Sequence, residues 1–135
     1  MKNIIVTILL SAVLALTVTG QTRSVSLINE TFTVDAGHAR SWSFKSPNCI
    51  NISGAFRAQG GNQNDIKVLV MEALDFENWK NGQTVQTYYN SGQITTAKFS
   101  VNLNKAEDFV IVFSNTAGFV QRSVSASVSL YPCRR

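Results

Sequence analysis

Apolar and polar residues alternate along most of the chain after about residue 20. The clearest stretch is RSVSASVSLY, where every second residue is a serine and the residues between them are apolar (Val124, Ala126, Val128 and Leu130). A helix would scatter these serines around its circumference, whereas a strand places every second residue on the same face. KFSVNL and ARSWSFK alternate in the same way, and TFTV and CINIS repeat the pattern. The alternation predicts β-strands.

Two other stretches, DIKVLVME and DFVIVF, are apolar on both faces through their middles. Such strands are covered on both sides or lie centrally in a sheet. Turn-forming segments (DAGH, SPN, QGGNQND, NSGQ, NKAED and NTAG) separate the strands, and the two prolines, Pro47 and Pro132, lie at boundaries. About eight short strands with regular turns predict an all-β fold, a single antiparallel β-sandwich of jelly-roll type.

One segment, ALDFENWKNGQ, breaks the strand pattern and leads to the next expected strand, VQTYY. Asp75 is a candidate N-cap and Asn81-Gly82 is a typical stop signal, so the segment predicts a single helical turn. Phe76 and Trp79 are three residues apart and would project from one side. We expect this side to cover the open end of the sandwich, with Trp79 at least half buried.

The first 20 residues differ in composition from the rest. Lys2 precedes an uncharged apolar run, Ile4 to Val18, which small or polar residues follow. This three-part pattern is typical of a secretory signal peptide, and the run is shorter than the roughly 20 residues that span a bilayer. We predict a signal peptide at residues 1–20, one β-sandwich domain at residues 21–135, and no stable membrane anchor after cleavage. The protein is therefore expected to be secreted or periplasmic.

Charge and cysteine content fit this location. The chain has 12 basic and 8 acidic side chains, and loss of Lys2 with the signal peptide lowers the formal net charge from +4 to +3. The basic residues are scattered, whereas nucleic-acid binding needs a cluster on one face, so we expect no nucleic-acid partner. Cys49 and Cys133 would form the one disulfide that two cysteines allow in an oxidising compartment. A metal site and a reactive thiol are the alternatives, and neither cysteine has a His, Cys or Asp nearby in sequence.

Catalytic chemistry has little support in the sequence. The single histidine, His38, lies in a turn three residues after Asp35, and no G-x-S-x-G elbow marks a nucleophile. Asp75 and Glu77 could pair as in a glycosidase, but such carboxylates normally come from separate elements. We therefore predict no enzyme, no catalytic residues and no cofactor.

A calcium site is the weak metal candidate. GGNQND supplies the oxygen donors Asn62, Asn64 and Asp65. Calcium prefers six to eight oxygens with several carboxylates, and this loop has one acid. A polar, glycine-rich turn is the alternative.

A glycan platform is another candidate. Trp79, Tyr88 and Tyr89 could form an aromatic ligand-binding surface on the sandwich. Adjacent tyrosines on a strand point to opposite faces, so only one could join Trp79. Packing of these rings against the protein itself is the alternative.

Residues 60 to 131 carry a family resemblance. NDIKVLVM, GQITTAKFSVNLNKAEDFVIVFSN and SVSASVSLY resemble the second half of a Golgi-dynamics (GOLD) type β-sandwich and are similar to the bacterial pre-peptidase C-terminal domains. The FSN of residues 113–115 matches the GOLD pattern, whereas Val112 stands where p24-type GOLD proteins often carry a cysteine. The resemblance implies a non-catalytic accessory, binding or chaperone-like module.

These observations favour a secreted, non-catalytic β-sandwich that binds a protein or cell-surface partner. A carbohydrate-binding module that uses Trp79 is the first alternative, and a small secreted hydrolase is the second.

Overall fold

The computed structural model describes residues 23–61 and 66–133. The predicted signal peptide and the calcium candidates Asn62, Asn64 and Asp65 lie outside the described residues, so both stay predictions.

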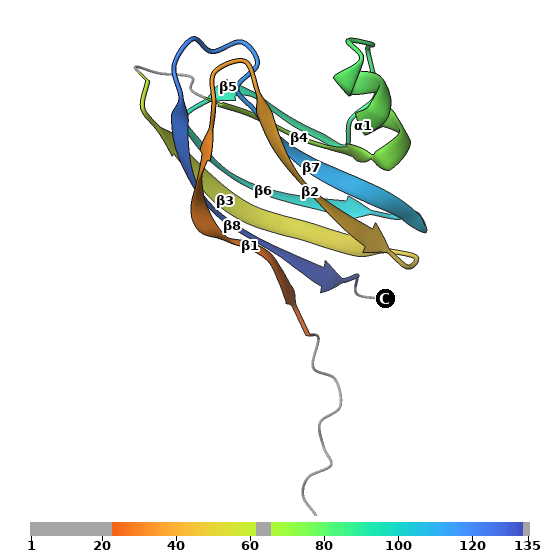
Figure 1. Cartoon of the computed structure of the whole chain (residues 1–135). Helices are drawn as coiled ribbons and strands as arrows, with labels where there is room; N and C mark the ends of the chain where they lie inside the picture. Colours follow the sequence, from red (N-terminus) through yellow and green to blue (C-terminus); the bar gives the residue numbers. More distant parts are fainter. Residues whose placement is uncertain (1–22, 62–65, 134–135) are drawn as a thin grey trace, which may run out of the picture.

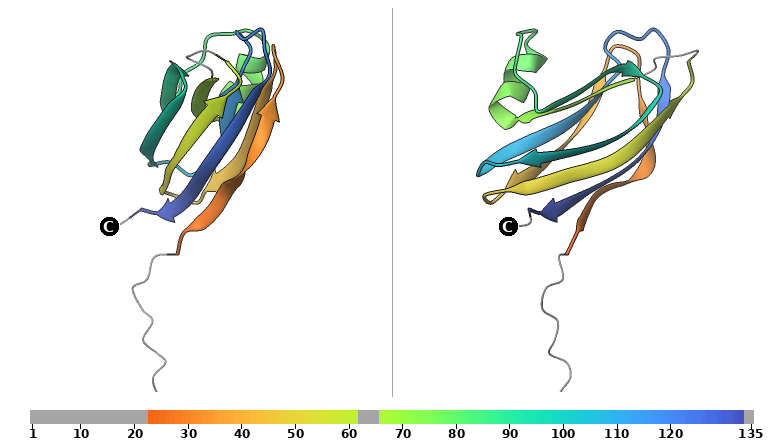
Figure 2. Two further views of the ribbon diagram at one scale, coloured as in Figure 1. Left: turned by 90° about the vertical axis from the view of Figure 1, so that its left-hand side faces the viewer. Right: turned by 180° about the vertical axis from the view of Figure 1, so that it is seen from behind.

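In the described part of the chain, eight strands and one helix build two four-stranded sheets that pack face to face (Figure 1). Figure 2 shows the same two layers from the side and from behind. The first sheet has the strand order β1-β8-β3-β6 and the second β2-β7-β4-β5. The elements are β1 (Val25–Val34), β2 (Ala39–Ser46), β3 (Ile50–Gln59), β4 (Ile66–Glu72), α1 (Ala73–Lys80), β5 (Tyr89–Ile94), β6 (Thr96–Leu103), β7 (Glu107–Ser114) and β8 (Arg122–Pro132).

The pairing follows one rule along the chain. Strand β1 pairs with β8, β2 with β7, β3 with β6 and β4 with β5, and every pair is antiparallel. The chain is therefore a long hairpin rolled into two sheets, which is the jelly-roll arrangement. The predicted fold class is confirmed.

The core lies between the sheets and is rich in aromatic rings. Phe113 of β7 is fully buried, and its ring centroid lies 5.1 Å from Phe32, 5.7 Å from Trp42 and 6.0 Å from Phe56. Edge-on contacts of this kind are favourable beyond the apolar area they bury. On β8 the alternation is as predicted, because its valines are buried while most of its serines face solvent.

The strands β4 and β7 are central in the second sheet and covered on both faces, as predicted. Their outer apolar residues (Leu69, Met71, Val110 and Val112) form a second cluster, against which Phe76 and Trp79 of α1 pack. The two rings are stacked, with centroids 6.1 Å apart, and Trp79 is more than half buried. The prediction that they cover the open end of the sandwich is wrong, because α1 lies against the outer face of the second sheet (Figure 1).

The helix ends as predicted but begins earlier. Gly82 adopts φ +82° and its amide donates to the carbonyl of Trp79 at 3.0 Å, which closes the helix. At the start, Glu72 occupies the N-cap position without a side-chain cap bond. The prediction of Asp75 as N-cap is therefore wrong: Asp75 lies in the first turn, where a negative charge is favourable without capping. No helix in the described residues is long and apolar enough to cross a membrane.

Strand β5 also differs from the expectation. The strand begins at Tyr89, so most of VQTYY is a connection, and the expected turn NSGQ lies inside the strand. Gly92 has φ +67°, its amide donates to the side-chain oxygen of Asn90 at 2.8 Å, and the pairing with β4 shifts between Lys67 and Leu69. An edge strand tolerates such an irregularity because only one neighbour must match its register.

The disulfide is present as predicted. Cys49 precedes β3 and Cys133 follows β8, and their Cα atoms are 5.6 Å apart. The bond therefore ties two adjacent strands of the first sheet at one end of the sandwich.

Candidate functional site

The residues expected to form an aromatic platform have different neighbours in the structure. Tyr88 packs edge-on against Phe109 with centroids 5.4 Å apart, whereas Tyr89 stacks on Phe99 at 4.9 Å. Trp79, which belongs to α1, packs against the outer face of the second sheet instead. Ligand binding by these three residues stays a prediction, and their packing favours the structural alternative.

Tyr88 also belongs to a polar cluster. Its hydroxyl donates to Glu72 Oε2 at 2.7 Å, and Lys105 Nζ donates to the two carboxylate oxygens of Glu72 at 3.2 and 3.0 Å. The hydrogen bond from Tyr88, followed by that from Lys105, lowers the pKa of Glu72 from its ordinary value. The same bonds to Glu72 raise the pKa of Tyr88 and of Lys105. Each shift favours the ordinary ionisation state of its group, and the bonds of Lys105 to Glu72 tie the β6–β7 turn to β4.

The other chemical candidates serve local structure. His38 Nδ1 donates to a backbone carbonyl two residues earlier at 3.0 Å, and the carboxylate of Asp35 accepts from Gln121 at 2.9 Å. Glu77 pairs with Lys80 one turn later in α1 at 3.0 Å. Among the described residues, no group of three or more His, Cys, Asp or Glu side chains could hold a metal ion.

The most exposed large apolar side chain of the described residues lies at one end of the sandwich. Phe119 is 94% exposed and its neighbour Val120 is 53% exposed. Both belong to the connection between β7 and β8, residues 115–121, which we call the tip loop. The tip loop lies beside the β1–β2 turn, at the upper end of the molecule in Figure 1. Single exposed apolar residues are common on protein surfaces. Whether Phe119 could serve as a binding residue therefore depends on whether the tip loop holds it in one conformation.

A buried asparagine side chain holds the tip loop in one conformation. Asn115 is 2% exposed, although it lies in a loop. Its Nδ2 donates to the carbonyl of Val34 at 3.1 Å and to the carbonyl of Val120 at 2.9 Å. One amide therefore joins the end of β1 to the residue next to Phe119. The bond to Val34 is buried, so breaking it removes a donor that water cannot easily replace, while the carbonyl of Val120 also accepts from Arg122 Nη1 at 2.8 Å.

The backbone of Asn115 fixes the neighbouring turn as well. Its amide donates to the carbonyl of His38 at 2.8 Å, and its carbonyl accepts from Gly37 at 2.9 Å and from Gly118 at 3.0 Å. Gly118 packs so closely on the Asn115 side chain that a Cβ atom there would collide with Oδ1. The two connections are therefore one hydrogen-bonded unit, and Phe119 projects from a rigid base.

The remaining exposed side chains of this unit are polar or small (Asp35, His38, Thr116, Ala117 and Gln121). The tip loop therefore presents an apolar tip, Phe119 with Val120, on a mostly polar surround. Sequence reasoning predicted the NTAG turn but did not single out this pair. The available signal was the pair of large apolar residues, Phe119-Val120, next to a segment of turn composition.

Comparisons with known proteins give a fold and no family. No protein-family model matches the chain, and no curated protein matches it. Among solved structures, it is similar to PliG of Aeromonas hydrophila, a periplasmic inhibitor of g-type lysozyme, with a TM-score of 0.51 and 9% identity over 81% of this chain and 87% of that one. It is also similar to the CBM36-1 domain of a multidomain xylanase from the hindgut metagenome of Trinervitermes trinervoides, with a TM-score of 0.45 and 11% identity over 85% of this chain and all of that domain.

At such low identity, the likeness to PliG shows the β-sandwich fold and carries no residue-level assignment. The sandwich expected from the resemblance to GOLD and pre-peptidase domains is confirmed, while membership of either family is not shown.

Proposed function

We propose that the protein is an extracytoplasmic, non-catalytic binding module that docks on a protein partner through the tip loop. The observation that carries this proposal is the exposed Phe119 on a base that Asn115 holds rigid. Binding energy in protein interfaces is concentrated in a few side chains, and aromatic anchors surrounded by polar residues are typical among them.

The energetics favour a preformed anchor. Burying an exposed Phe side chain contributes roughly 1.5 to 3 kcal/mol. Ordering a flexible loop on binding would offset much of this, because each backbone residue that becomes fixed costs roughly 1 to 2 kcal/mol. The hydrogen bonds of Asn115 fix the loop before it meets a partner. The full contribution of Phe119 is then available for association.

A protein pocket fits the tip loop better than a lipid surface. Loops and helices that bind membranes combine apolar residues with lysines and arginines that attract anionic headgroups. The exposed side chains of this unit include the acidic Asp35 and no lysine or arginine. One Phe and one Val would hold the protein at a bilayer only weakly. A concave pocket would bury the Phe119 ring on all sides while the polar surround meets a polar rim.

Location and family relation are part of the proposal. The predicted signal peptide and the Cys49–Cys133 disulfide support an oxidising, extracytoplasmic compartment. The resemblance of residues 60 to 131 to GOLD-type and pre-peptidase C-terminal domains remains a hypothesis, and it supports an accessory or binding role rather than catalysis.

The test is capture of a partner with matched variants. The mature chain, residues 21–135, is immobilised as the wild type, as Phe119→Ala, and as Leu74→Ala, which removes a 74% exposed side chain from α1. A protein from the extracytoplasmic fraction should bind the wild type and Leu74→Ala but not Phe119→Ala. Purified g-type lysozyme is the first defined partner to try, because the similar fold of PliG belongs to an inhibitor of that enzyme. Equal capture by all three chains would contradict the proposal.

A further inference from the structure

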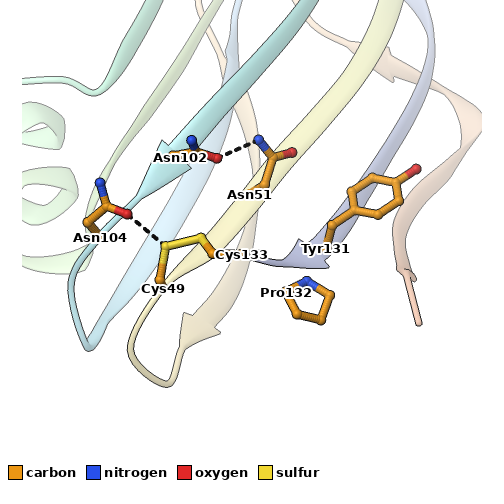
Figure 3. A pocket seen from close by; sticks show the side chains of 7 residues that line it. All are labelled: Cys49, Asn51, Asn102, Asn104, Tyr131, Pro132 and Cys133. Carbon is orange, nitrogen blue, oxygen red and sulfur yellow. Dashed lines mark hydrogen bonds between the residues drawn. A yellow bond between two sulfur atoms is a disulfide. The ribbon is translucent and has the colours of Figure 1, made fainter. Parts of the chain in front are cut away.

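A hollow lies beside the disulfide, at the end of the first sheet opposite the tip loop (Figure 3). It is open to solvent, has a volume of about 520 Å³ and is lined by residues of β3, β6 and β8 and the segments next to them (Cys49, Asn51, Asn102, Asn104, Tyr131, Pro132 and Cys133). We call it the amide cleft. Strand β8 runs from the tip loop to the cleft over 11 residues, so the two surfaces are roughly 35 Å apart. We propose that the amide cleft binds a neutral saccharide.

Strand register brings the key side chains into one row. Asn51 of β3 is paired with Tyr131 of β8 on one side and with Asn102 of β6 on the other. Directly paired residues of neighbouring strands project from the same face of a sheet, about 5 Å apart. The cleft therefore has a tyrosine ring on one flank, an amide on the other and a third polar group at its floor. Tyr131 is 40% exposed, so its ring is accessible to a ligand.

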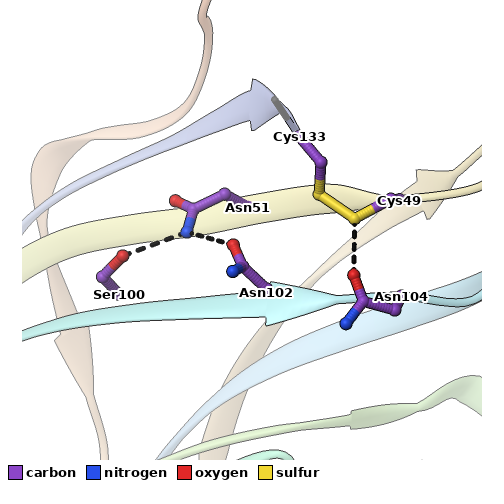
Figure 4. The surroundings of a disulfide bond; sticks show 6 residues. All are labelled: Cys49, Asn51, Ser100, Asn102, Asn104 and Cys133. Carbon is purple, nitrogen blue, oxygen red and sulfur yellow. Dashed lines mark hydrogen bonds between the residues drawn. A yellow bond between two sulfur atoms is a disulfide. The ribbon is translucent and has the colours of Figure 1, made fainter. Parts of the chain in front are cut away.

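The side-chain amide of Asn51, at the floor of the cleft, orients the side-chain amide of Asn102 on its flank. Asn51 Nδ2 donates to Asn102 Oδ1 at 2.8 Å and to Ser100 Oγ at 3.0 Å, which uses both of its hydrogens (Figure 4). Ser53 in turn donates to the Asn51 side-chain oxygen. Because Asn102 accepts through its oxygen, its NH₂ group is directed away from Asn51. Two donors are thus presented by an exposed side chain whose rotamer is already fixed.

The disulfide forms the end wall of the cleft, next to a further amide side chain. Asn104 Oδ1 lies 2.7 Å from Cys49 Sγ. A disulfide sulfur has no hydrogen to donate, so this contact is not a hydrogen bond and does not orient the Asn104 amide. Figure 3 shows the nitrogen of Asn104 directed away from the sulfur, as in Asn102. The cleft therefore carries one preoriented amide, Asn102, with the amide of Asn104 beside the disulfide.

The chemistry of these groups selects the ligand class. A carboxamide offers a donor pair and an acceptor side by side, which suits the adjacent hydroxyl groups of a sugar ring. An accessible tyrosine ring offers an apolar face to the C–H groups of the same ring. The seven described residues that line the cleft carry no charge, so a phosphate, sulfate or uronate would find no ion pair among them. A cleft with an aromatic face and a few fixed polar groups is typical of small-molecule sites.

The experiment is a titration followed by ¹⁵N NMR, which observes the side-chain NH₂ groups of Asn102 and Asn104 directly. The probes are hexasaccharides of xylose, glucose (β-1,4 and α-1,4 linked), mannose and N-acetylglucosamine, with hexagalacturonate as the charged counterpart. We expect saturable shifts of the two amide groups with at least one neutral probe and weaker or no binding of hexagalacturonate. No saturable shift with any neutral probe up to about 10 mM would overturn the proposal, as would preference for the uronate.

Variants locate the site. Tyr131→Ala and Asn102→Ala should each weaken binding by about tenfold or more, while Tyr131→Phe, which keeps the ring, should stay within about threefold of wild type. Tyr88→Ala is the matched control, because Tyr88 is also 40% exposed but lies outside the cleft. Binding that survives both cleft substitutions, or that falls equally in the control, would overturn the proposal. Backbone spectra of each variant report whether it is folded.

The saccharide proposal and the protein-docking proposal can be tested separately. Phe119→Ala should bind the saccharide as the wild type does, since the tip loop and the cleft lie at opposite ends of β8. Loss of saccharide binding in Phe119→Ala would show that the ligand is not held in the amide cleft.

Discussion

Asn115→Ala tests whether the tip loop is held as the structure shows. The substitution removes two hydrogen bonds, to the carbonyls of Val34 and Val120. Each such bond contributes a net 0.5 to 1.5 kcal/mol or so, and a buried carbonyl left without a partner costs roughly a further 1 to 3 kcal/mol. Val34 is 1% exposed, so its carbonyl loses a buried donor, whereas the carbonyl of Val120 keeps a second donor, Arg122 Nη1 at 2.8 Å. We therefore expect the free energy of unfolding to fall by about 3 kcal/mol.

Urea unfolding measures this loss, with an unchanged slope showing that the unfolded state is the same. Asn29→Ala is the control, because Asn29 is exposed on β1, and surface changes cost about 0.5 kcal/mol or less. Amide hydrogen exchange should accelerate at Gly37 and Gly118, whose amides donate to the backbone of Asn115. A loss below about 1 kcal/mol with unchanged exchange at both glycines would refute the account of a rigid tip loop.

Three further predictions concern other parts of the sandwich. Trp79→Ala should lower the free energy of unfolding by roughly 3 kcal/mol or more, because the ring packs on the outer face of the second sheet, while Leu74→Ala on the same helix stays within about 0.5 kcal/mol; equal urea midpoints for the two variants would contradict this packing. Reduction of the disulfide, which closes a loop of 84 residues, should cost about 4.5 kcal/mol in the chain-entropy model, and intact mass after alkylation without reductant should show no free thiol. The folded-state pKa of Glu72 is lowered, so its contribution is present above the ordinary value of 4.5 and lost as pH falls through the folded value; the stability difference between wild type and Glu72→Gln should shrink in acid, and a difference that grows there would contradict the pairing.

Most of the strands were predictable because one face is buried and the other faces solvent. In β8 the serines and the apolar residues alternate without a break, and the structure buries the apolar set. In β4 and β7 both faces are apolar, and the structure covers both. The place of α1 was harder to predict, since a short amphipathic segment fits either an open end or an apolar outer face. The predicted N-cap at Asp75 is wrong because the helix begins at Ala73, and the Glu72 side chain before it bonds to Tyr88 and Lys105 rather than to the helix.

The amide cleft could not be identified from local sequence, because its residues come from three strands and meet through register. The predicted disulfide, however, implies one of the contacts in the cleft. If Cys49 and Cys133 are bonded across antiparallel strands, then the residues two places along each strand, Asn51 and Tyr131, must be partners, as they are. The third partner, Asn102, required the pairing of β3 with β6, which no residue pattern specifies.

The central claim is that Phe119 anchors a protein partner, and the affinity of the captured partner tests it most directly. Surface plasmon resonance with the purified partner should give a dissociation constant at least about 30-fold larger for Phe119→Ala than for the wild type, which corresponds to a hot-spot contribution of roughly 2 kcal/mol. The control Leu74→Ala, with a similarly exposed apolar side chain on α1, should stay within about twofold. A Phe119→Ala chain that is folded and binds the partner as tightly as Leu74→Ala would contradict the account.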